Sequence, residues 1–134
     1  MVGLKDKRLY RITIDADNDP ATNPTAADVL AFDIPNPGCV GGTARPFGLG
    51  VRGDNVFMGV ICDASTSLQK TDLWAYVYKL NTLEDTFSEA VNFPLNYARG
   101  NVSGVTFSRD KSSWQPWNAD ADWNERQQRC GSGI

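Results

Sequence analysis

The chain has 134 residues, of which 41% are hydrophobic and 22% are charged, a composition that excludes a largely disordered protein and fits one domain or part of one. Its net charge of -3 at pH 7 lacks the positive excess with which nucleic-acid-binding proteins contact phosphates, so we expect no nucleic-acid partner. No apolar run reaches the 18 or so residues that a membrane-spanning helix needs, so we expect no membrane insertion.

Short runs of β-branched and aromatic residues recur along the chain between clusters of Gly, Pro, Asn and Asp. No long segment keeps the apolar stripe of an amphipathic helix. The pattern predicts an all-β protein built from antiparallel strands. The predicted strands cover residues 8–15, 29–34, 47–51, 56–62, 73–80 and 87–95.

Two passages read as diverged copies of each other: LYRITID followed by DVLAFDIPNPG, and LWAYVYKL followed by EAVNFPLNYARG. Aligning Leu9 with Leu73, and Phe32 with Phe93, gives a period of about 60 residues, which suits a four-stranded propeller blade with long loops. The sequence therefore predicts repeated antiparallel sheets.

The passage ARPFGLGVRGDNVFMGVICDAS is apolar or glycine on both faces of two consecutive strands. A strand with one wet face alternates apolar and polar residues, so this pattern indicates strands that are covered on both sides. In a β-propeller the innermost strand lies where blades converge, and Gly48 and Gly50 suit that close approach. We expect Phe47, Leu49 and Val51 to pack between blades.

These features predict a fragment of an antiparallel β-propeller with about one and a half four-stranded blades, in a single partial domain over residues 1–134. Residues 8–37 form the outer hairpin of one blade, residues 44–97 form a complete blade, and residues 98–134 form an irregular, Trp-rich segment. Pro94 cannot donate a ladder hydrogen bond, so the last strand is an edge strand. Because one and a half blades cannot close a ring, we expect the partners to be further blades of a larger chain or a second copy.

The three cysteines, Cys39, Cys62 and Cys130, lack the spacing of a zinc site, and the chain has no His. If the strands beside RGDN pair as a hairpin, Cys62 lies opposite Arg45, and CVGGTAR can fold back to bring Cys39 near. We predict a Cys39–Cys62 disulfide, which marks an oxidising compartment, with Cys130 left over. The alternative is a cytosolic scaffold in which Cys62 is a small buried side chain and Cys39 an exposed thiol.

Two acidic passages, DADNDP and DADWNE, have the alternating oxygen ligands of a calcium loop. Neither continues with the Gly and Glu of an EF-hand, so solvated turns are the preferred interpretation and a calcium-bound surface loop is the alternative. We expect no other cofactor. The candidate ligands are Asp15, Asp17, Asp19, Asp120, Asp122 and Asn124.

Three tryptophans, Trp114, Trp117 and Trp123, lie close together in a polar segment. They form either an aromatic platform for sugar rings or a loop that folds back onto the sheets. The tripeptide from Arg52 to Asp54 is also an integrin-recognition sequence, but the positive-φ positions of a tight hairpin explain it without a receptor.

Five passages occur in an order that resembles the propeller-like region of large bacterial cell-surface proteins, the SD-repeat-containing and B-type-domain proteins: NPGCVGGTARPFGLGV, NVFMGVICDAS, DLWAYVYKL, FPLNYARG and WQPW. The resemblance covers residues 8–120 and implies a secreted, adhesin-like protein. In that family the chain continues into another blade after WQPW, whereas this sequence stops at Ile134, which favours a fragment.

The sequence is poor in catalytic signals: it has no His, no G-x-S-x-G elbow and no phosphate-binding loop before a helix. We therefore predict a non-enzymatic structural or adhesive module of a secreted or surface-anchored bacterial protein, with an unidentified protein or glycan ligand. One alternative is a fragment of a carbohydrate-binding or carbohydrate-active propeller enzyme. The other is a cytosolic protein-interaction scaffold. The first residues, MVGLKDKRLY, lack the apolar region of a signal peptide, so either the protein is cytosolic or Met1 is not the natural start of a secreted chain.

Overall fold

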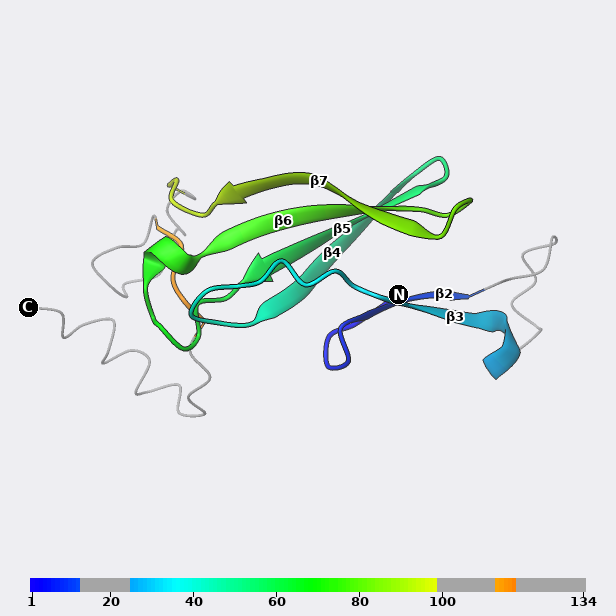
Figure 1. Ribbon diagram of the computed structural model, residues 1–134, viewed down its shortest axis with the longest axis horizontal. Helices are drawn as coiled ribbons and strands as arrows, with labels where there is room; N and C mark the ends of the chain where they lie inside the picture. The colour runs from blue at the N-terminus through cyan, green and yellow to red at the C-terminus, as the bar shows by residue number, and fades with distance from the viewer. Residues whose placement is uncertain (13–24, 99–112, 118–134) are drawn as a thin grey trace, which may run out of the picture.

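The computed structural model describes residues 1–12, 25–98 and 113–117. These residues form two antiparallel sheets, and they contain no α-helix. The first sheet has the order β1-β2-β3 and the second has the order β4-β5-β6-β7. The strands are β1 (Val2–Gly3), β2 (Arg8–Ile12), β3 (Val29–Asp33), β4 (Ala44–Arg52), β5 (Asn55–Cys62), β6 (Trp74–Asn81) and β7 (Thr86–Pro94), and the short 3-10 turns are η1 (Ala26–Asp28) and η2 (Lys70–Asp72) (Figure 1).

The all-β, antiparallel prediction is confirmed, and each of the six predicted strands has its counterpart. The strand β2 is described to Ile12, and residues 13–15 of the predicted strand lie outside the described residues. The short strand β1 was not predicted, because two residues carry no periodicity. The second sheet is a meander in which each strand pairs with the next along the chain.

A β-bulge in β4 changes the predicted register of the β4–β5 hairpin by one residue. Val51 pairs with Val56, as a turn at Gly53 requires, but the register shifts between Phe47 and Leu49. The extra residue is Gly48, whose φ of 69° suits glycine. Cys62 therefore pairs with Ala44, and the expected position opposite Arg45 is wrong by one residue.

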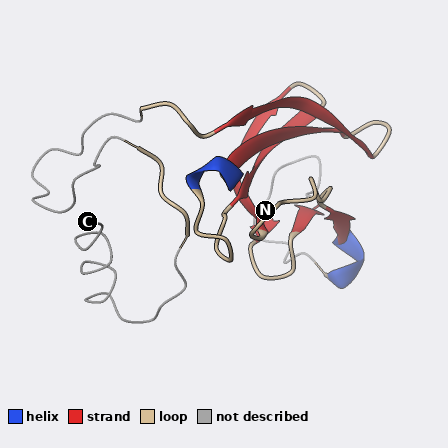
Figure 2. Ribbon diagram, turned by 60° about the vertical axis from the view of Figure 1, so that its left-hand side comes forward, coloured by secondary structure: helices blue, strands red, loops and turns tan. Residues whose placement is uncertain are grey.

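The two sheets pack face to face through what we call their inner faces. Leu9 of the first sheet contacts Met58 and Leu80 of the second, and all three side chains are buried. The partly buried side chains around them come from both sheets and from the linker that joins them: Val2, Phe32, Ile34, Val56 and Phe87. Figure 2 shows the sheets as separate layers. This interface is the hydrophobic core that joins the two sheets.

Arg11 adds a polar connection between the sheets. Its guanidinium donates to a carboxylate oxygen of Asp85 at 2.7 Å and to the carbonyl oxygen of Thr82 at 3.1 Å, both in the turn between β6 and β7. The same guanidinium lies 5.4 Å from the ring centre of Phe32. Arg11 thus fixes one end of the first sheet against the second.

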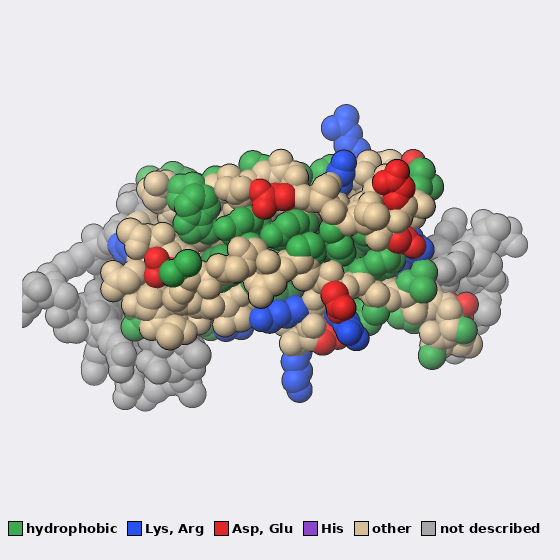
Figure 3. Space-filling model, viewed as in Figure 1, with side chains coloured by type: hydrophobic (Ala, Val, Ile, Leu, Met, Phe, Trp, Pro, Cys, Tyr) green, Lys and Arg blue, Asp and Glu red, His purple; other side chains and the backbone are tan. Residues whose placement is uncertain are grey.

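The described residues leave much of β4 uncovered, and the expectation that neighbouring blades cover both of its sides stays a prediction. Phe47, Leu49 and Val51 are 61%, 43% and 73% exposed. The first sheet is small, since β1 has only two residues, and it covers only part of the second sheet. Figure 3 shows hydrophobic side chains exposed in a band along the middle of the molecule.

None of the described helical segments is long and apolar enough to cross a membrane.

Candidate functional site

The linker between the sheets is fastened at the end of β5. Cys39 in the linker and Cys62, the last residue of β5, form a disulfide with a Cα–Cα distance of 5.3 Å. This is the pair predicted from the hairpin beside RGDN and from the folding back of CVGGTAR. Cys62 is 2% exposed, so this end of the bridge is shielded from solvent. The disulfide ties the segment that enters β4 to the end of β5, one of the two inner strands of the second sheet.

Asp63, which follows Cys62, is a buried carboxylate with three hydrogen-bond donors. Its oxygens accept hydrogen bonds from the backbone N–H groups of Thr43 at 2.7 Å and Ser65 at 3.0 Å, and from the Nε of Arg45. The side chain of Asp63 is 4% exposed, whereas that of Arg45 is 41% exposed. Asp63 therefore holds the start of β4 and the end of β5 together, beside the disulfide.

The environment of Asp63 favours its ionised form. Burial alone raises the pKa of this carboxyl, but the hydrogen bonds from Thr43, Ser65 and Arg45 outweigh burial and hold the pKa below its usual value. The charge is thus partnered, as a buried carboxylate requires.

The two glycines of CVGGTAR allow this close packing. A Cβ on Gly42 would lie 2.5 Å from the backbone nitrogen of Ala64, and Gly41 has a φ of 63°. The carbonyl oxygen of Gly41 accepts hydrogen bonds from the N–H groups of Thr66 and Ser67. A larger residue at position 42 would push the linker away from the strand end.

Trp117 and Trp114 pack against the same end of the second sheet. The backbone N–H of Trp117 donates to the carbonyl oxygen of Asp63 at 2.8 Å, and the centre of the Trp117 ring lies 5.2 Å from the guanidinium carbon of Arg45. Trp114 packs against a buried cluster of Ala64, Leu73 and Leu95. These contacts correspond to the sequence interpretation in which the tryptophans fold back onto the sheets. Trp123 lies outside the described residues.

The Arg52–Asp54 tripeptide lies at the tip of the β4–β5 hairpin. Gly53 has a φ of 56°, and Arg52 and Asp54 are exposed. The carbonyl oxygen of Asp54 accepts hydrogen bonds from the N–H and the hydroxyl of Thr82, each at 2.9 Å. The tripeptide therefore meets the needs of the turn and anchors the neighbouring β6–β7 turn.

All six candidate calcium ligands lie outside the described residues. Within the described ranges, no group of three or more His, Cys, Asp or Glu side chains could hold a metal ion.

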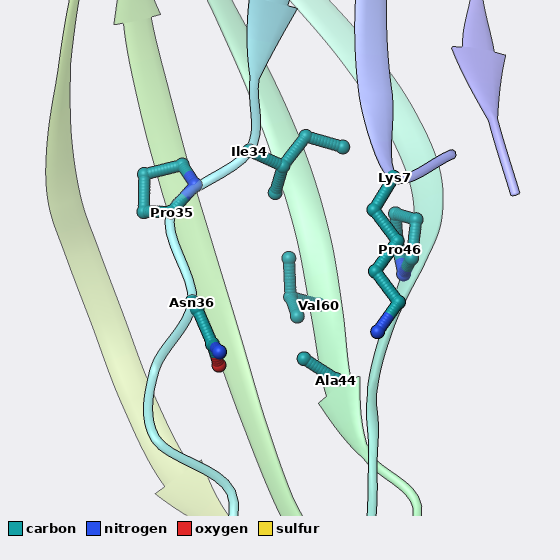
Figure 4. Close-up of a pocket in the computed structure, with 7 residues that line it drawn as sticks. All are labelled: Lys7, Ile34, Pro35, Asn36, Ala44, Pro46 and Val60. Carbon is teal, nitrogen blue, oxygen red and sulfur yellow. The ribbon is translucent and has the colours of Figure 1, made fainter. Parts of the chain in front are cut away.

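A small hollow lies where the linker crosses the inner face of the second sheet (Figure 4). Its volume of about 60 Å³ holds a few water molecules and is well below the roughly 300–1,000 Å³ of small-molecule sites. The hollow is therefore a packing gap of the inter-sheet seam. Its lining residues are Lys7, Ile34, Pro35, Asn36, Ala44, Pro46 and Val60.

Sequence reasoning missed Asp63 and its partner Arg45. In the sequence, an Asp directly after an apolar strand looks like a solvated turn residue. Its donors Thr43 and Arg45 are distant from it in the sequence, so no local pattern indicates that the carboxylate is buried. The nearest available signal was the Gly-Gly pair in the linker, which implies a close backbone approach.

This chain is similar to three curated proteins of Dictyostelium discoideum, the colossins A, B and C. The identity is 30% over 105 residues with colossin-B, 27% over 123 residues with colossin-A and 32% over 97 residues with colossin-C. These three alignments cover 71%, 87% and 71% of this chain, respectively. The matched regions span only 3%, 1% and 10% of those proteins. No family model matches the chain. No solved structure matches it either.

These matches correct the resemblance inferred from the five passages. The similar proteins come from Dictyostelium, so the assignment to bacterial SD-repeat surface proteins is wrong. The five passages are short strand and turn motifs. Such motifs recur in unrelated β proteins because strands and tight turns favour the same residue types, so they do not identify a family.

Proposed function

We propose that this chain is a non-enzymatic structural module of a large secreted protein, in which antiparallel sheets stack face to face in series in a β-propeller-like arrangement. The observation that carries the proposal is the Cys39–Cys62 disulfide, which joins the linker between the sheets to the end of β5. A disulfide at such a junction fixes the geometry of the linker and persists in an oxidising compartment.

The neighbouring contacts support a structural role. Asp63, Arg45 and Trp117 all hold backbone segments together at this junction. The length of the colossins also supports a module, because the chain matches only a small part of each. The serial stacking is supported by the repeated pattern of the strands and by the face-to-face packing of the two sheets.

Thiol counting tests the proposal. We expect one free thiol per chain when the protein is denatured without reductant and alkylated, and peptide mapping should place it at Cys130. Three free thiols would overturn the secreted-module proposal and favour the cytosolic scaffold. The measurement should use protein made in an oxidising compartment and a reduced sample as the reference.

A further inference from the structure

The second sheet has an apolar outer face, on the side away from the first sheet. Its side chains come from all four strands, and the exposed ones include Phe47 at 61%, Val91 at 47% and Phe93 at 36%. The register places Phe47, Gly59, Val77 and Val91 in one row across the strands. The apolar side chains of this outer face are Phe47, Phe57, Ile61, Ala75, Val77, Val91 and Phe93. At one end, Ile61 and Ala75 pack with Trp114 on the buried cluster of Ala64, Leu73 and Leu95, so the exposed part of the face lies around Phe47, Val91 and Phe93.

The first sheet also has an outer face with an apolar patch. In the β2–β3 ladder, Tyr10 pairs with Ala31 and Ile12 pairs with Val29, on the side opposite to Leu9. Ile12 is 38% exposed, and Ala31 is exposed as well. The same face carries the exposed Arg8–Asp33 ion pair beside this patch. The two-sheet stack therefore ends in two different surfaces, each with an exposed apolar patch.

The repeat in the sequence shows how these surfaces are related. Leu9 and Phe32 lie on the inner face of the first sheet, which already packs on the second sheet. Their counterparts, Leu73 and Phe93, share the outer face of the second sheet with Ala75, the partner of Phe93. The outer face of the second sheet thus corresponds to the inner face of the first sheet, the face that packs on the second sheet.

We propose that the outer face of the second sheet binds the outer face of the first sheet in a second copy of this chain. The contact continues the existing inter-sheet interface in the same direction, and the inference rests on the proposed stacking module. Because the two surfaces differ, the association is head to tail: each copy uses one surface for the preceding copy and the other for the following copy.

The test uses the full chain and three substitutions to Glu. Two of them place a negative charge in the proposed contact between copies, and the third places the same charge outside it. Val91→Glu alters the outer face of the second sheet, and Ala31→Glu alters the outer face of the first. Leu83→Glu is the matched control, because Leu83 is 77% exposed in the β6–β7 turn and belongs to neither surface. Sedimentation velocity over a range of concentrations measures the mass, and circular dichroism verifies that each variant is folded.

We expect the unmodified chain and Leu83→Glu to form oligomers that grow with concentration, and each of the other two variants to remain monomeric alone. An equal mixture of Val91→Glu and Ala31→Glu should form a 1:1 dimer and no larger species, since each supplies the surface that the other lacks.

Several results would overturn the inference. They are a monomeric unmodified chain at every concentration, undiminished association of Val91→Glu, dimerisation of Ala31→Glu alone, and a mixture that stays monomeric. Dimerisation of Ala31→Glu alone would show that two copies pair through the same outer face. The thiol count is independent of all these outcomes, so it separates failure of this inference from failure of the proposed function.

Discussion

Asp63 illustrates how a single polar residue can organise the junction between the sheets. Its carboxylate accepts hydrogen bonds from two backbone N–H groups and from Arg45. Removing a buried acceptor leaves its donors without partners, which costs more than the hydrogen bonds themselves contribute. Since the two backbone donors belong to the linker and to the loop after β5, their loss of an acceptor would loosen both segments at once.

We predict that Asp63→Ala lowers the free energy of unfolding by about 2–3 kcal/mol, because the N–H groups of Thr43 and Ser65 lose their acceptor. The matched control is Asp33→Ala, which removes a carboxylate that is 82% exposed and paired with Arg8. An exposed pair of this kind contributes at most about 1 kcal/mol. Urea unfolding of both variants measures the difference. Equal effects would contradict the structural role of Asp63.

The lowered pKa of Asp63 gives this contribution a pH dependence. A carboxyl whose folded pKa lies below its unfolded value of about 3.9 stabilises the fold above that pH and loses the contribution as the pH falls through the folded pKa. The stability difference between the unmodified chain and Asp63→Asn should therefore shrink below about pH 4.

At the scale of elements, the strands were predictable from the sequence because their signals are local. Apolar runs bounded by Gly, Asn and Asp define both the strands and the hairpin turn at Gly53. The bulge was not predictable, since Gly48 reads equally well as a residue kept small for close approach. The environment of Asp63 was not predictable either, because it depends on contacts between segments that are distant in the sequence.

Gly48 and Gly50 offer a matched test of the bulge. Both lie in β4, and a Cβ built on either meets no atom within 4 Å, but only Gly48 has a positive φ, 69°. We predict that Gly48→Ala destabilises the protein by about 1–2 kcal/mol, because L-residues are strained in this conformation. Gly50→Ala should be neutral or stabilise by up to about 1 kcal/mol, by restricting the unfolded chain. Guanidinium unfolding compares them, and equal costs would show that the bulge does not require a glycine.

At the scale of the whole molecule, the two sheets depend on each other. The first sheet is too small to bury a core alone, and Leu9 finds its buried neighbours, Met58 and Leu80, on the second sheet. Arg11 and the disulfide-fastened linker add two further connections. The sheets should therefore unfold together, as one cooperative unit.

The central claim is that the chain is one structural module whose junction is fixed by the Cys39–Cys62 disulfide. Thermal unfolding with and without reductant tests it most directly. We predict a single transition in both conditions, with a midpoint lower by on the order of 10 °C after reduction, because opening a loop of this size removes about 3 kcal/mol. Two separate transitions, or a midpoint that reductant does not change, would contradict the account.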